Sequence, residues 1–118
     1  MTAKEYLSQA KRQDRRIGAL LDRQRRYHEL AGSCGENGRA RMLELEKELD
    51  ERIGAYAALV REIEGVIDAV GDAQYRDVLK YRYLNGWSWQ RIAERMYFSQ
   101  DWVWRLHARA LKAVRVPE

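Results

Sequence analysis

The chain has 118 residues, enough for one small domain or for a domain with a helical extension. Charged residues make up 34% of the sequence and apolar residues 46%, with a formal net charge of +4, which is the composition of a folded, polar chain. No apolar run approaches the roughly 20 residues of a membrane span, and no signal-peptide core is present. Cys34 is the single cysteine, which excludes an intrachain disulfide. These features predict a cytoplasmic protein.

The pattern of helix breakers predicts an all-α fold. Pro117 is the only proline, and runs of β-branched residues are few. The sequence predicts a long, coiled-coil-like helical hairpin over residues 1–70, followed by a three-helix unit over residues 71–118.

The first predicted helix begins at a capping box formed by Thr2 and Glu5. Its heptad seam repeats in steps of four and three for about four heptads, through Tyr6, Ala10, Gln13, Ile17, Leu20, Gln24, Tyr27 and Ala31, and the two glutamines weaken it. Three glycines in residues 32–38 then predict a flexible loop.

The second predicted helix runs from about Arg39 to Val70. Its seam is Met42, Leu45, Leu49, Ile53, Tyr56, Val60, Ile63, Ile67 and Val70. A short loop between two helices of similar length favours an antiparallel hairpin. Such a hairpin buries only one stripe, so we expect a homodimer through these helices. The sequence leaves open whether the hairpin closes on itself or opens into an intermolecular coil.

Charge is distributed unevenly along the chain. Residues 1–30 carry a net charge of +4, residues 31–70 carry −4, and residues 71–118 carry +4. The first helix is therefore expected to pair with the acidic second helix, which leaves residues 71–118 as the free basic surface.

The last part of the chain contains three capped helices. Asp72 is the predicted N-cap of the first, and Asn85-Gly86 ends it. Ser88 caps the second helix, and Ser99 caps the third. The apolar face of the second helix consists of Trp89, Ile92, Ala93 and Met96. The short turn at Tyr97-Phe98 between two capped helices predicts a helix-turn-helix.

The third helix has one apolar and one basic face. Val103, Leu106, Ala110 and Val114 form the apolar face, while Asp101, Arg105 and Lys112 lie opposite. This division is what an α-helix needs to read the major groove. Candidate base-reading residues are Gln100, Asp101 and Arg105, since Arg pairs with guanine and Gln with adenine. Candidate contacts to the DNA backbone are Arg91, Arg95, Ser99, Trp104, Arg109, Lys112 and Arg115.

The alternative for these positions is a plain solvated helix face. Trp102 and Trp104 lie beside the basic face, where they either pack at the edge of the core, stack on the sugar–phosphate backbone or bind a protein. His107 is expected to be a partly buried packing residue.

The segment Arg82-Tyr83-Leu84-Asn85-Gly86-Trp87-Ser88-Trp89, with Ile92-Ala93-Glu94 and Ser99, resembles region 4 of sigma-70-type factors. It is more similar still to small phage-borne proteins with a region 4-like helix-turn-helix. The last helix of those proteins also tends to carry Arg-Leu-His and Arg-Ala-Leu, which occur in this chain as Arg105-Leu106-His107 and Arg109-Ala110-Leu111. The resemblance implies a DNA-binding transcription regulator of phage or prophage type. Its implied partners are double-stranded DNA and host RNA polymerase in a bacterial cell.

Two positions depart from the family pattern. Tyr97 stands where the family usually has Gly, so a positive φ there would strain the turn. Arg91 stands where a Glu often completes the capping box of the second helix.

Other functional classes receive little support. Two histidines and one cysteine without ligand spacing predict no metal or cofactor site. No nucleophile–base pair is recognisable, so an enzyme is not expected. Two alternatives stay open, namely a DNA-packaging subunit of the small-terminase kind and a polymerase-binding adaptor that does not bind DNA.

Overall fold

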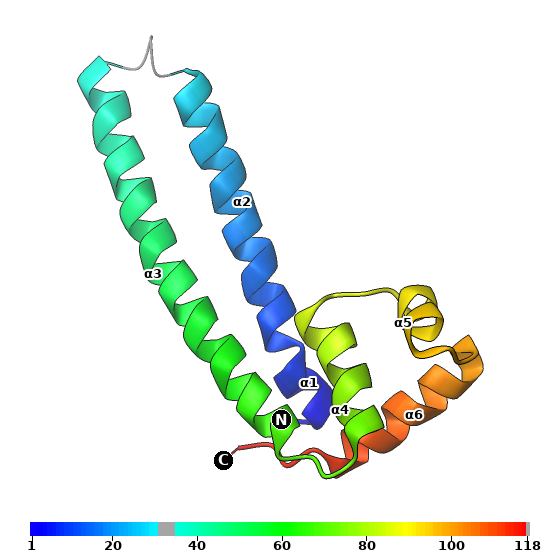
Figure 1. Cartoon of the computed structure of the whole chain (residues 1–118). Helices are drawn as coiled ribbons and strands as arrows, with labels where there is room; N and C mark the ends of the chain where they lie inside the picture. The colour runs from blue at the N-terminus through cyan, green and yellow to red at the C-terminus, as the bar shows by residue number, and fades with distance from the viewer. Residues whose placement is uncertain (31–34, 118) are drawn as a thin grey trace. The chain divides into compact units, whose positions relative to one another are not determined.

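The computed structural model describes residues 1–30 and 35–117, and all regular secondary structure in these residues is helical. The elements are α1 (Ala3–Leu7), α2 (Gln9–Glu29), α3 (Gly35–Asp68), α4 (Ala73–Leu79), the π-helical turn η2 (Lys80–Leu84), α5 (Trp89–Met96) and α6 (Gln100–Ala113) (Figure 1). The all-α prediction is confirmed. Within the described part of the chain, every helix is too short or too polar to cross a membrane.

Packing divides the chain into two compact units, each of which draws on α2 and α3. The hairpin unit comprises Arg12–Ala58, and the composite unit comprises Met1–Lys11 together with Leu59–Glu118. This division differs from the expected boundary between residues 70 and 71. The first eleven residues and the last turns of α3 pack with the three C-terminal helices.

The hairpin unit closes within one chain. Its core contains Ile17 and Leu20 from α2 and Leu45 and Leu49 from α3, and the partly buried Tyr27 and Tyr56 pack against it. The two helices lie side by side in Figure 1 and run antiparallel. Burial raises the pKa of the Tyr56 hydroxyl, and the nearby carboxylate of Asp14 raises it further. The predicted antiparallel hairpin is therefore present as an intramolecular structure.

Two details of the predicted second helix are wrong. Gly35, at φ +60, begins α3, so residues 35–38 are helical rather than part of a loop; residues 31–34 lie outside the described residues. Ile53 is 45% exposed and does not belong to the buried seam. Ile53 follows Leu45 by eight residues, which places it about 80° away from Leu45 around the helix axis. Tyr56 follows Leu49 by seven residues, which brings it back to the side of the core.

The expected charge pairing between the first two long helices is also wrong. Arg26 pairs with Glu29 inside α2, whereas Arg41–Glu44 and Arg52–Glu48 pair inside α3. No ion pair joins α2 to α3 in the part of the chain that the structure describes. The basic side chains of α2 are left exposed to solvent as a result.

The predicted N-terminal helix is interrupted at Ser8. Thr2 caps α1 as expected, because its hydroxyl oxygen accepts a hydrogen bond from the Glu5 amide at 3.1 Å. The Ser8 hydroxyl donates to the Lys4 carbonyl at 2.6 Å, which competes with the regular helical pattern and ends α1. The chain then continues as α2.

The core of the composite unit joins both ends of the sequence. α1, α4 and α5 all contact α6. The largest fully buried side chains come from α1, from the end of α3 and from the three C-terminal helices: Leu7, Ile63, Ile67, Val78, Leu79, Ile92 and Val103. The N-terminal residues are therefore part of the support for α6.

Candidate nucleic-acid interface

The helix before the helix-turn-helix begins as predicted and ends with a widened turn. One carboxylate oxygen of Asp72 accepts hydrogen bonds from the amides of Gln74 at 2.8 Å and Tyr75 at 3.1 Å. After Leu79 the helix widens into η2, where the Asn85 amide donates to the Lys80 carbonyl. Gly86, at φ +70, then reverses the chain.

The widened turn brings Tyr83 onto His107 of α6. The Tyr83 hydroxyl and the His107 Nε2 atom are 2.7 Å apart, and the edge of the Trp89 ring lies against His107 with the centroids 4.8 Å apart. Burial lowers the pKa of His107 to about 4, and the positive charges of Arg82 and Lys4 act in the same direction. His107 is therefore a neutral packing residue near pH 7, as the sequence predicts.

The second helix and its turn form the first half of the helix-turn-helix. The Ser88 hydroxyl oxygen accepts a hydrogen bond from the Arg91 amide at 3.2 Å, and Ile92 and Ala93 are buried. Tyr97 has φ 59 and ψ 40, the left-handed conformation. The Phe98 amide donates to the Ala93 carbonyl at 3.0 Å, which completes a Schellman-type end of α5. The turn therefore keeps the left-handed residue, with Tyr97 in the place where the family usually has Gly.

We expect Tyr97→Gly to stabilise the fold by about 1 kcal/mol, because Gly adopts a left-handed conformation without the steric cost of a Cβ atom. Tyr97 is 92% exposed, so the substitution removes almost no buried contact. Chemical denaturation measures the difference. Tyr97→Ala is the matched control, since it shortens the side chain but keeps the strained Cβ. An equal gain from both substitutions would show that strain is not the cause.

The last helix, α6, presents the predicted faces. The Ser99 hydroxyl oxygen accepts from the Trp102 amide at 3.2 Å and caps the helix. Val103, Leu106 and Ala110 are buried, and Val114 lies just beyond the helix end, where it is half-buried. The apolar face is confirmed for Val103, Leu106 and Ala110, whereas Val114 is not part of the helix.

The predicted base-reading residues are exposed on α6. Gln100 and Asp101 lie in the first turn, and Arg105 follows one turn later. Asp101, Arg105 and Lys112 share the side opposite Val103. Ala108 is exposed on the same side and was not singled out from the sequence. Its small side chain lets another molecule approach the backbone of α6 closely.

Trp102 and Trp104 have different environments. Trp102 is half-buried, with its ring 6.3 Å from that of Phe98 and the Arg109 guanidinium 5.5 Å from its centroid. Trp102 therefore packs at the edge of the core. Trp104 is 50% exposed beside the basic face and is available to an external partner.

The structure places Arg91 and Arg95 in an aromatic notch that the sequence did not reveal. Tyr81 stacks on Trp87 with ring centroids 4.6 Å apart, and the Arg91 guanidinium lies 4.1 Å from the Trp87 ring centroid. The notch, of about 460 Å³, is lined by Tyr81, Trp87, Arg91, Glu94, Arg95 and Tyr97. It combines two cations with flat rings, which suits a phosphate or an aromatic side chain.

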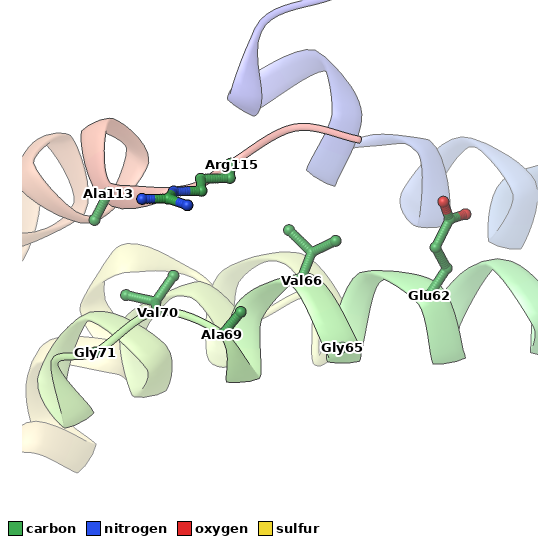
Figure 2. A pocket seen from close by; sticks show the side chains of 8 residues that line it. All are labelled: Glu62, Gly65, Val66, Ala69, Val70, Gly71, Ala113 and Arg115. Atoms are coloured by element: carbon green, nitrogen blue, oxygen red, sulfur yellow. The ribbon is translucent and has the colours of Figure 1, made fainter. Parts of the chain in front are cut away.

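Arg115 is placed apart from the other predicted backbone contacts. It follows the end of α6 and lines a groove of about 670 Å³ with the last turns of α3 (Figure 2). The other lining residues are Glu62, Gly65, Val66, Ala69, Val70, Gly71 and Ala113. The remaining predicted contacts, Ser99, Trp104, Arg109 and Lys112, are all exposed on α6 or at its cap. No cluster of three potential metal ligands occurs among the described residues.

Two capped helices joined by a tight turn, with the second helix apolar inside and basic outside, define a DNA-binding helix-turn-helix. Residues 72–116 match the family model of sigma-70, region 4, so this segment is a sigma-70 region 4-like helix-turn-helix. The match does not extend to α1, α2 or α3. No curated protein and no solved structure matches the chain.

Proposed function

We propose that the protein is a sequence-specific transcription regulator of phage or prophage type, which acts at promoters with host RNA polymerase in the bacterial cytoplasm. The observation that carries the proposal is the division of α6. Its inner side chains Val103, Leu106 and Ala110 are held in the core, while Gln100, Asp101 and Arg105 are exposed near its N-terminal end. In helix-turn-helix proteins, side chains at that end of the recognition helix contact base edges.

In this proposal the residues around α6 divide into two roles. Arg105 binds a guanine edge, and Gln100 and Asp101 contact neighbouring bases. Arg91, Arg95, Ser99, Trp104, Arg109 and Lys112 contact sugars and phosphates, which fixes the register without reading sequence. The Ser99 hydroxyl keeps its hydrogen for this purpose, since only its oxygen is used in the cap. Arg115 contributes less, because it lies in the groove beside α3.

Arg105→Ala is expected to cost roughly 1–3 kcal/mol of discrimination between the preferred site and a site with the contacted base pair changed. The matched control is Arg109→Ala, which is expected to weaken binding to all duplexes alike. Competition binding with the two duplexes measures both effects. If Arg105→Ala leaves affinity and preference unchanged, the assignment of the recognition helix is wrong.

The target is found by selecting bound fragments from the genome that encodes the protein, at about physiological salt, and sequencing them. Enrichment of one motif upstream of a gene cluster supports a sequence-specific regulator. Recovery of all fragments alike, lost on adding salt, favours the DNA-packaging subunit. No recovery from folded protein excludes DNA binding and favours the adaptor.

The polymerase-binding adaptor is supported by one specific feature of the surface. Tyr97 is 92% exposed and Trp104 is 50% exposed, and exposed aromatic side chains are common anchors in protein interfaces. Binding to polymerase that persists in Arg105→Ala, without any DNA binding by the parent protein, would establish this alternative.

We further propose a homodimer through the hairpin unit. Leu21 of α2 and Ile53 of α3 are 43% and 45% exposed, although both are large apolar residues. Leu21→Glu combined with Ile53→Glu is expected to convert a dimer to a monomer, because it places charges in the contact. Light scattering after gel filtration measures the mass. A parent protein that is monomeric at all concentrations would contradict the dimer.

A further inference from the structure

Three arginines form a stripe along α2 that the helix-turn-helix does not explain. Arg12, Arg16 and Arg23 are exposed and fall within about 40° of one another around the helix axis. We call these residues the arginine stripe. It extends for about 16 Å along the helix, which equals the rise of about five base pairs of duplex DNA.

The arginine stripe lacks intramolecular neutralisation. None of its three residues forms an ion pair with any described residue. Of the three acidic residues of α2, Asp14 lies close to Tyr56, Glu29 is bound to Arg26, and the exposed Asp22 forms no ion pair with the stripe. Repulsion between like charges one turn apart disfavours the unbound protein by a few tenths of a kcal/mol per pair. A bound polyanion would relieve that repulsion.

Two residues of the arginine stripe, Arg16 and Arg23, also line a groove between the two helices of the hairpin unit. The groove, of about 290 Å³, is bounded by Arg16, Ala19, Leu20, Arg23, Glu48 and Arg52. Its single carboxylate, Glu48, is already bound to Arg52 at 3.3 Å. Three guanidinium groups and one carboxylate therefore line the groove. The net charge of the groove is positive, so it is complementary to an anion.

We propose that the arginine stripe is a second phosphate-contacting surface for duplex DNA. The proposal rests on the proposed function, namely that the protein binds DNA through α6. Two features favour a phosphate backbone over an acidic protein. The stripe consists of guanidinium groups, which bind phosphate in a bidentate way. Of the two residues between Arg16 and Arg23 that line the groove, only Ala19 is exposed, and it offers no large apolar anchor for a protein partner.

The test compares two triple variants of the full chain. Arg12→Gln, Arg16→Gln and Arg23→Gln together remove the stripe, and Lys11→Gln, Arg25→Gln and Lys47→Gln together remove the same charge from exposed positions elsewhere. Glutamine is a good helix former, so both proteins should fold, which circular dichroism checks. A fluorescent duplex of random sequence is the probe.

The expected result is a smaller salt dependence for the stripe variant alone. Loss of three phosphate contacts lowers the slope of log affinity against log salt by roughly 3, so between about 50 and 200 mM salt the parent loses about forty-fold more affinity than the variant. The control should keep a slope close to that of the parent. Arg→Lys at the three stripe positions should also keep the slope, because each cation still releases counterions.

The remaining outcomes separate the two proposals. If the stripe variant binds with the slope of the parent while Arg105→Ala loses site preference, the stripe is ordinary solvated surface and the proposed function stands. If the control lowers the slope as much as the stripe variant does, the effect is one of net charge and the stripe proposal fails. If neither the parent nor the variants bind DNA, the proposed function is wrong, and the stripe proposal, which rests on it, is wrong as well. If the stripe variant loses only polymerase binding, the partner of the stripe is a protein.

Discussion

Leu7→Ala is expected to destabilise the helix-turn-helix by about 3 kcal/mol, within the range measured for fully buried leucines. Leu7 is 0% exposed, and α1 packs against α6 in the composite unit. Truncation leaves a cavity in the core of the composite unit. The measurement is chemical denaturation followed by tryptophan fluorescence, because the four tryptophans lie between residues 87 and 104 and report on this unit.

The matched control for this experiment is Leu43→Ala. Leu43 lies on α3 and is 67% exposed, so its truncation should change the free energy of unfolding by less than about 0.5 kcal/mol. A transition in Leu7→Ala that coincides with that of the parent would show that the N-terminal residues do not support the helix-turn-helix. It would also restore a domain boundary near residue 70.

Stability is expected to fall by about 2 kcal/mol as the pH is lowered from about 6.5 to 4, because of His107 alone. In the folded protein burial lowers the pKa of His107 to about 4, whereas the unfolded chain has the ordinary value of 6.5. Between these values only the unfolded state binds the proton, so acid favours unfolding. Below pH 4 both states are protonated and this contribution levels off. The magnitude allows for the partial exposure of the ring.

His107→Gln isolates this contribution from the titration of carboxylates. Glutamine does not titrate, and its amide can still form a hydrogen bond with the Tyr83 hydroxyl. Denaturation curves at several pH values for parent and variant give the difference, which should appear between pH 4 and 6.5. Parallel pH profiles of the two proteins would mean that His107 is not held neutral by the fold.

The features that the sequence predicted correctly are local ones. Thr2, Asp72, Ser88 and Ser99 all cap helices, because a capping side chain bonds to amides two or three residues away. The faces of α6 follow from the helical period. These signals need no knowledge of distant residues.

The features that the sequence did not predict depend on distant packing. The packing of α1 against α6 and the hydrogen bond between Tyr83 and His107 join segments with no shared periodicity. The expected ion pairing between α2 and α3 was wrong for a related reason. The net charge of a segment does not specify which of its side chains meet those of another segment. Arg115 was assigned to the basic face by its helical angle, but α6 ends at Ala113.

The discontinuous composite unit has a consequence for synthesis of the protein. Met1–Lys11 is synthesised before its partners in α4 to α6, and the whole hairpin unit becomes available in between. The hairpin unit can fold while translation continues, and the apolar side chains of Tyr6 and Leu7 must wait for α6. The recognition helix α6 is the last of these helices to be made, so the helix-turn-helix is complete only when translation has passed Ala113.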